Sequence, residues 1–305
     1  MNRLFSIFTW FLDKCIGIFP RKFTHQIARC MSFFLYITLF RYFFNSDTKT
    51  IQKALSVSHK QAKKIALNGF ANLCVFLVDY QFMALASIKK VSDLMDTTNI
   101  VGLDHIQDSI NSNRPIILAS IHMDSFMIGV LKLCKLIPSQ RHVAIIKFNS
   151  EKPKEIQSYA KFKELGANIS VIRLNENPAL EILKQLRAGN LIFIMCDVNP
   201  KLGKTVSVEW FGKSAHFHCG LVELAIATKA LILPLVVSQS SNTSKENYML
   251  TFEPPIDPLL VTASGFQEKT MLMSQLIASH IETWVKRNPG QWHSWGILTL
   301  AWNKE

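Results

Sequence analysis

From residue 116 onwards, short apolar runs alternate with stretches whose apolar residues recur at helical spacing. Apolar runs without polar alternation are typical of strands that are covered on both faces. We therefore expect an α/β fold with a mixed central sheet flanked by helices. The expected strands are residues 116–121, 143–148, 169–174, 191–196, 231–237 and 248–252. The expected helices are residues 126–136, 156–165, 179–186, 221–228 and 266–286.

The first 44 residues have a different pattern, in which two apolar runs, 4–12 and 31–40, are dense in aromatic side chains. Each run is shorter than the ~20 residues that a membrane-spanning helix needs. Asp13 and Lys14 interrupt the first run and no small-residue cleavage site follows, so we expect the segment to be retained. The basic residues among the aromatic ones are Arg3, Lys14, Arg21, Lys22, Arg29 and Arg41. The combination favours a helix pair at an anionic membrane surface, and two buried core helices are the alternative.

These patterns divide the chain into three parts. We expect residues 1–44 to form a hydrophobic helical membrane anchor. Residues 45–95, first lysine-rich and then apolar, should form a helical segment that packs on the core. Residues 96–305 should form the α/β core.

Composition restricts the classes of partner. Of the 305 residues, 49% are hydrophobic and 18% are charged, and the formal net charge is +12. This charge favours anionic partners such as nucleic acid, anionic lipid or an acidic carrier protein. The sequence has no zinc-finger spacing, aromatic RNA-binding motif or concentrated basic helix, so we expect no nucleic-acid partner. None of the six cysteines forms a Cys-x-x-Cys pair, and we expect reduced thiols and neither a metal nor a cofactor.

His122 is the first candidate for chemistry, because it comes directly after the expected strand 116–121. Ligands of open α/β sheets bind beyond the strand ends. A histidine there can act as a general base, since its unperturbed pKa is near 6.5 and a neighbouring carboxylate tunes it. Asp124 and Ser125 are natural N-cap residues for the next helix. We expect Asp124 to be either the partner of His122 or only a cap, and a purely structural His122 is the alternative.

A second polar segment follows the expected strand 191–196. Asp197 ends that strand, and a loop with Lys201 and Lys204 leads to a Trp-Phe-Gly turn at residues 210–212. Such a loop can hold an anionic group beside an apolar slot. The next helix begins near Gly220.

A His-x-x-x-x-Glu match, His218 and Glu223, lies in the same region. We interpret it mainly as a coincidence and keep it as an alternative catalytic pair.

Taken in order, these segments resemble the acyltransferases that add secondary acyl chains to lipid A, a branch of the lysophospholipid-acyltransferase-like superfamily. The resemblance covers most of the chain, and the order of its motifs is more specific than any one of them. Besides the hydrophobic N-terminus, it rests on residues 41–81, His122 and residues 186–189, 197–198, 210–212, 220–225, 233–234 and 289–292.

The resemblance implies transfer of a fatty acyl chain from an acyl-carrier-protein thioester, or from acyl-CoA, to a glycolipid hydroxyl at the cytoplasmic face of the bacterial inner membrane. The histidine would deprotonate the hydroxyl, and an acid five residues later would orient the imidazole. The substrate-binding residues that the resemblance implies are Asp197, Lys201, Lys204, Phe211, Gly212 and Gly220.

The sequence departs from the family pattern at three places. Met127 stands where the family has the acid, lysines replace the usual arginines after Asp197, and residues 295–297 lack the expected basic side chains. Two main hypotheses follow: an active membrane-associated acyltransferase with His122 as base, or a catalytically impaired relative that binds lipid or carrier beside an active enzyme. An acyltransferase that acts on a non-lipid-A hydroxyl or amine is a third hypothesis.

Overall fold

A computed structural model describes residues 10, 11, 13, 14, 16, 19–37, 45–147, 153–174, 178–239 and 248–302. Its main sheet has the strand order β1-β9-β8-β2-β5-β3-β4. These strands are β1 (Asn99–Val101), β2 (Ile116–Ser120), β3 (Val143–Lys147), β4 (Ile169–Arg173), β5 (Leu191–Met195), β8 (Leu231–Gln239) and β9 (Tyr248–Phe252). Neighbouring strands are parallel except β8 and β9. The expected mixed sheet flanked by helices is confirmed.

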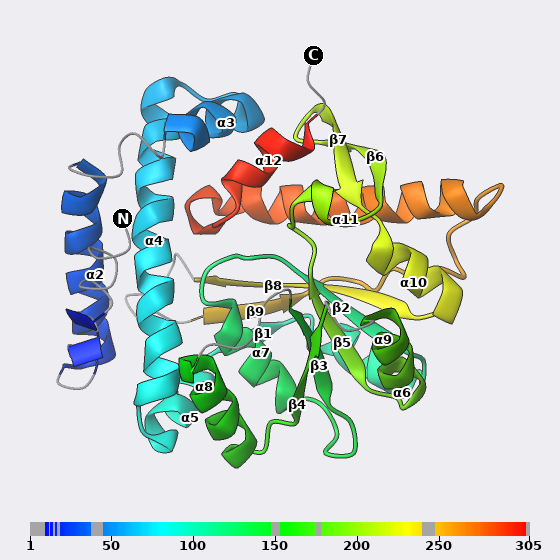
Figure 1. Cartoon of the computed structure of the whole chain (residues 1–305), viewed down its shortest axis with the longest axis horizontal. Helices are drawn as coiled ribbons and strands as arrows, with labels where there is room; N and C mark the ends of the chain where they lie inside the picture. The colour runs from blue at the N-terminus through cyan, green and yellow to red at the C-terminus, as the bar shows by residue number, and fades with distance from the viewer. Residues whose placement is uncertain are drawn as a thin grey trace.

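Helices cover both faces of this sheet (Figure 1). One face carries α5 (Ile88–Asp96), α6 (Leu103–Asn111), α7 (Phe126–Cys134) and α8 (Pro153–Glu164). The other carries α9 (Pro178–Arg187), α10 (Gly220–Thr228), α11 (Phe266–Arg287) and α12 (Trp295–Ala301). Along one side run α2 (Arg21–Leu35), α3 (Asn45–Leu55) and α4 (His59–Leu85), with α2 packed against α4.

The continuous apolar runs are explained by burial on both faces. Every residue of β2 is buried, and its side chains alternate between two hydrophobic clusters. Ile116 and Leu118 pack with the helices α5–α8, whereas Ile117 and Ala119 pack with α9–α12. A strand of this kind needs no polar face, which is why its sequence shows no alternation.

A separate antiparallel hairpin follows β5, formed by β6 (Thr205–Trp210) and β7 (Lys213–His218). The turn between them is Phe211-Gly212, and both residues have positive φ, 52° and 68°. Two-residue hairpin turns of this kind require positive φ at both positions. Phe211 tolerates it because its ring is buried and stacks on Trp292 at 6.1 Å. The sequence correctly predicts the turn at residues 210–212. It wrongly predicts a loop over the residues that form β6.

The expected membrane anchor lies partly outside the described residues, which exclude residues 4–9 and 12 of the first apolar run and 38–40 of the second. Among the described helices, α4 alone is long and apolar enough to cross a membrane. However, α2, α3, α8 and the short 3₁₀ helix Pro289–Gln291 all pack against it, as they would around a core helix. The anchor and the three-part division of the chain therefore stay predictions.

Candidate functional site

His122 and Asp197 meet at the carboxyl-terminal edge of the sheet. β2 and β5 pair in parallel with Ser120 opposite Met195, so the residues two positions beyond each strand also come together. The His122 ring bonds through Nδ1 to Asp197 Oδ1 at 2.8 Å. The backbone N–H of His122 also donates to both Asp197 oxygens, at 3.1 and 3.0 Å. The carboxylate that contacts the imidazole is thus Asp197, 75 positions away in the chain.

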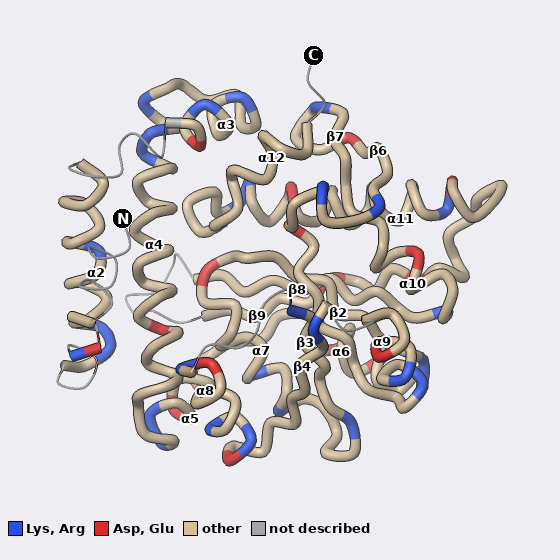
Figure 2. The backbone as a smooth tube through the Cα atoms, in the orientation of Figure 1, with Lys and Arg blue, Asp and Glu red and all other residues tan. Residues whose placement is uncertain are grey.

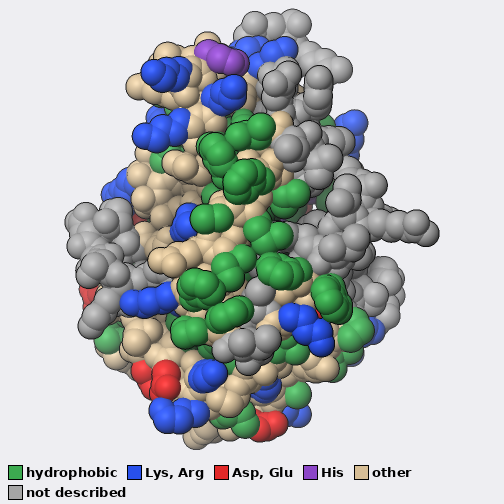
Figure 3. All heavy atoms as spheres, turned by 90° about the vertical axis from the view of Figure 1, so that its left-hand side faces the viewer, with side chains coloured by type: hydrophobic (Ala, Val, Ile, Leu, Met, Phe, Trp, Pro, Cys, Tyr) green, Lys and Arg blue, Asp and Glu red, His purple; other side chains and the backbone are tan. Residues whose placement is uncertain are grey.

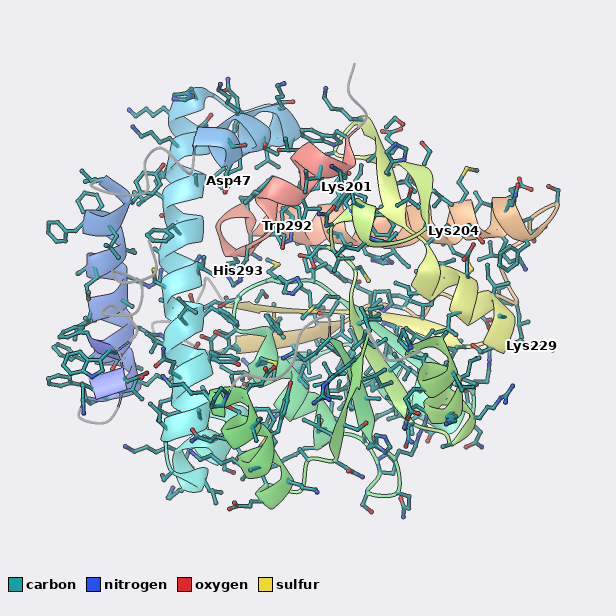
Figure 4. All side chains as sticks on the ribbon, in the orientation of Figure 1. Asp47, Lys201, Lys204, Lys229, Trp292 and His293 are labelled. Atoms are coloured by element: carbon teal, nitrogen blue, oxygen red, sulfur yellow. The ribbon has the colours of Figure 1, made fainter. Side chains whose placement is uncertain are left out.

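Trp292 donates a further hydrogen bond to Asp197. Its buried indole Nε1 donates to Asp197 Oδ2 at 2.8 Å. The segment that carries it lies antiparallel to the residues around His122, through a bridge between Met123 and Trp292 and a 3.0 Å bond from His293 N to His122 O. Figure 4 shows Trp292 and His293 inside the molecule, following α11. Every oxygen of the buried carboxylate therefore accepts defined hydrogen bonds.

The electrostatics of this pair suit a general base. Burial by itself lowers the pKa of His122, but the charge of Asp197 and the hydrogen bond to it outweigh burial, so the pKa is raised above its usual 6.5. Burial by itself raises the pKa of Asp197, but His122 and Trp292 lower it overall, so the carboxylate is ionised at neutral pH. Since Nδ1 is engaged with Asp197, Nε2 is the ring atom that can take a proton from a ligand.

His122 opens onto a large cavity of about 970 Å³ that lies over the strand ends. The lining residues are mostly apolar and come from both sides of the sheet. Those on the α9–α10 side include Ile117, Ile182, Ile192, Leu221 and Leu224. Those on the α4–α7 side include Phe76, Leu77, Phe126 and Met127. The side chain of His122 is 39% exposed, whereas that of Asp197 is fully buried, so only the imidazole is open to a ligand.

Aromatic rings fix the orientation of the imidazole. Phe126 contacts His122 edge to face at a centroid distance of 5.5 Å, and Phe76 stacks on Phe126 at 5.3 Å. The ring centroid of His293 lies 5.3 Å from that of Phe76. Burial lowers the pKa of His293 to about 4, so it is neutral and acts as a third aromatic ring of this wall.

Asp124, the partner expected from the sequence, faces another way. It has φ of 47°, and its Oδ1 accepts from the backbone N of Ser125 at 2.9 Å. Burial and then the neighbouring Asp79 raise its pKa from 3.8 to about 7. The structure therefore places Asp124 in the turn that presents His122, not against the imidazole.

Replacement of Asp124 by asparagine should leave the activity of the His122 site within a few-fold of the wild-type rate. Asparagine tolerates positive φ and has the same shape without the charge. Because the pKa of Asp124 is raised on folding, the wild-type protein loses stability as the pH rises from about 4 to about 7. The stability of Asp124→Asn relative to wild type should therefore grow across that window, which urea unfolding at several pH values would measure. A hundredfold loss of activity would instead support Asp124 as the partner of His122.

The other residues expected from the sequence are divided between the cavity and its surroundings. Lys204, His218 and Gly220 line the cavity. Lys204 pairs with Glu223 at 2.5 Å and His218 bonds to Asn199 O at 2.6 Å, so the alternative pair His218 and Glu223 have other partners.

The remaining predicted residues lie away from the cavity lining. Lys201 is exposed on a short 3₁₀ turn, and Figure 4 shows it on the hairpin side of the molecule with Lys204. Phe211 reaches the site only through Trp292, and Gly212 lines a second, smaller pocket. Among the described residues, no group of three or more His, Cys, Asp or Glu side chains is placed to hold a metal ion.

Comparison with known proteins identifies a protein family that this chain matches. The model of the family described as bacterial lipid A biosynthesis acyltransferase matches residues 5–295, nearly the whole chain. Comparison with curated proteins gives no match.

Proposed function

Because the chain belongs to the bacterial lipid A biosynthesis acyltransferase family, we propose that it moves a fatty acyl chain from an acyl thioester to a hydroxyl group of a glycolipid such as a lipid A precursor. The observation that carries this proposal is the His122–Asp197 pair at the mouth of a large apolar cavity. The donor is an acyl-carrier protein or coenzyme A.

In this reaction His122 Nε2 takes the proton of the acceptor hydroxyl as its oxygen attacks the thioester carbonyl. The C–S bond then breaks, and the proton goes from His122 to the departing thiolate. Asp197 holds Nδ1 protonated, so that Nε2 is the basic atom, and it stabilises the imidazolium that forms. Trp292 and the backbone N–H of His122 keep the carboxylate in place.

The cavity has the properties needed for the acyl chain. Its volume is at the upper end of the ~300–1,000 Å³ typical of small-molecule sites, and most of its lining is aliphatic or aromatic. Met127 is part of that lining and is buried. In our proposal, residue 127, where the family pattern has an acid, contacts the acyl chain instead. The carboxylate that the imidazole needs comes from Asp197.

This arrangement argues against the impaired relative. That hypothesis rested on the loss of an acid at position 127, which would leave His122 without a carboxylate. Asp197 provides one at 2.8 Å, with its charge maintained by hydrogen bonds.

Membrane association has its best support in α2, whose faces are inverted relative to an ordinary surface helix. The face of α2 toward the protein is polar, with Thr24, His25 and Ser32 buried. Its outward face exposes Phe23, Phe33 and Phe34, among others. Figure 3 shows hydrophobic side chains gathered on this side of the molecule, with basic ones beside them. Such a helix suits an apolar surrounding rather than water.

The neighbouring charges fit an anionic surface. Figure 2 shows Lys and Arg on α3 and at the start of α4, next to α2. The exposed lysines there are Lys49, Lys53, Lys60, Lys63 and Lys64. We place this side of the protein on the cytoplasmic face of the bacterial inner membrane, where anionic headgroups attract such lysines.

Replacing Phe33 and Phe34 by serine together should weaken binding to phosphatidylglycerol-containing vesicles about a hundredfold. Each ring that leaves lipid for water costs about 1.5 kcal/mol, and 1.4 kcal/mol is tenfold. Co-sedimentation over a range of lipid concentrations measures the change. As a control, Leu259→Ser with Leu260→Ser alters an even more exposed apolar pair between β9 and α11. Equal losses for both pairs would argue against α2 as the membrane contact.

The function itself is tested with the full chain in detergent, a carrier-protein or coenzyme A thioester, and a lipid A precursor. Mass spectrometry of the glycolipid should show the added acyl chain, and the free thiol should appear in equal amount. Thioester hydrolysis without an acylated lipid would reject glycolipid transfer.

A further inference from the structure

The polar face of α2 makes contacts that membrane association does not require. Arg21 bonds to Asp79 on α4, from Nε to Oδ1 at 2.7 Å and from Nη2 to Oδ2 at 3.1 Å. His25 Nε2 bonds to Asp79 Oδ1 at 2.8 Å. Asp79 and His25 are fully buried. These bonds by themselves show only that α2 is held against α4.

The second oxygen of Asp79 extends the network to the catalytic turn. Ser125 Oγ donates to Asp79 Oδ2 at 2.5 Å, and the hydroxyl of Tyr248 on β9 donates to the same oxygen. Ser125 is the N-cap residue of α7, three positions after His122. The carboxylate of Asp79 therefore holds α2 with one oxygen and shares the other between α2, the turn that presents His122, and the sheet.

Arg29 of α2 is linked through Asn72 and Gln239 to the residues that precede Trp292. It donates to Asn72 Oδ1 at 2.9 Å and to Gln239 Oε1 at 3.3 Å. Asn72 Nδ2 in turn donates to Gly290 O at 2.6 Å, and Gln291 exchanges two bonds with the backbone of Gln239. Residues 290–291 directly precede Trp292, which holds Asp197.

A buried carboxylate with these partners is costly to assemble and sensitive to the loss of any of them. Removal of one partner of a buried ion pair is strongly destabilising, because it leaves a charge buried without compensation. A fully bonded buried polar network also fixes one geometry, because alternative arrangements leave groups unpaired in a medium of low dielectric constant. The geometry fixed here includes two of the three segments that carry the His122–Asp197–Trp292 arrangement, those of His122 and Trp292.

We infer that Asp79 is a positioning residue that makes the membrane-facing helix α2 part of the active-site scaffold, so that α2 holds His122 in register with Asp197. The inference rests on the proposed role of His122. The aromatic face of α2 contacts lipid, and its polar face sets the catalytic turn.

The test compares the two faces of α2 in the full chain. Arg21→Gln should raise amide hydrogen exchange in the peptide that spans residues 121–130 at least about tenfold and lower kcat about tenfold, with KM for the thioester and vesicle binding unchanged. Arg21→Lys, which keeps a cation beside Asp79, should restore both values. Phe33→Ser with Phe34→Ser should weaken vesicle binding and leave exchange in residues 121–130 at its wild-type rate.

Ser125→Ala provides a second variant in case Arg21→Gln fails to fold. It removes a single hydroxyl and keeps Arg21 on Asp79, so lower kcat with unchanged thermal stability would support the inference. The inference would be overturned if Arg21→Gln had the wild-type kcat and the wild-type exchange rate in residues 121–130. If Arg21→Gln fails to fold, the same result for Ser125→Ala would overturn it. A wild-type protein without transferase activity would reject the proposed function, yet the exchange measurements would still decide whether α2 positions the turn.

Discussion

Replacement of His122 by alanine should lower the rate of acyl transfer at least about a hundredfold, the scale that loss of a general base typically shows. His122 lines the cavity and its ring contacts the Asp197 carboxylate. In the proposed reaction, alanine leaves the acceptor hydroxyl without a group that can take its proton. Initial rates of glycolipid acylation, with the thioester saturating, measure the effect. Asp197 keeps Trp292 and a backbone N–H as donors, so the variant should fold.

His216→Ala is a suitable control, because His216 is exposed on the hairpin strand β7 and does not line the cavity. A full wild-type rate for His122→Ala would remove His122 from the mechanism. If His218→Ala lost activity in its place, the base would belong to the alternative pair with Glu223.

The strands of the main sheet could be predicted because burial on both faces leaves a plain signal. Runs such as residues 116–119 and 191–195 contain no polar residue, and they end shortly before His122 and Asp197. The hairpin strand β6 also has a readable pattern. Thr205, Ser207 and Glu209 alternate with apolar residues, as expected for a half-exposed strand, but we interpreted the segment as a basic loop.

The pairing of His122 with Asp197 could not be predicted in the same way. The sequence shows that each residue follows a strand, but not that β2 and β5 are neighbours or share a register. Local spacing predicts the carboxylate within one helical turn of His122, where Asp124 is closest. Asp124 has positive φ, and its carboxylate accepts a hydrogen bond from the backbone N–H of Ser125 within the turn instead of contacting the imidazole. Long-range strand order, and not local spacing, decides which acid reaches the imidazole.

Replacement of Asp197 by asparagine should lower the acylation rate about a hundredfold, but no more than the loss of His122 itself, because Asp197 acts through His122. Asparagine is the same size, but it cannot stabilise the imidazolium that forms in the transition state. Its amide also presents an NH₂ group where two N–H donors now meet carboxylate oxygens. The fold should weaken as well, so the rate is measured at a temperature at which circular dichroism shows the variant folded.

The pH dependence separates a catalytic effect of Asp197 from a purely structural one. In the wild-type protein the pKa of His122 is raised above 6.5, so activity should increase as the pH rises through a value above 6.5 and frees Nε2. Without the carboxylate, burial remains and lowers the pKa of His122, so the acid limb of Asp197→Asn should move to lower pH. A variant that loses its rate while the acid limb stays in place would show that Asp197 supports the fold but does not set the basicity of His122.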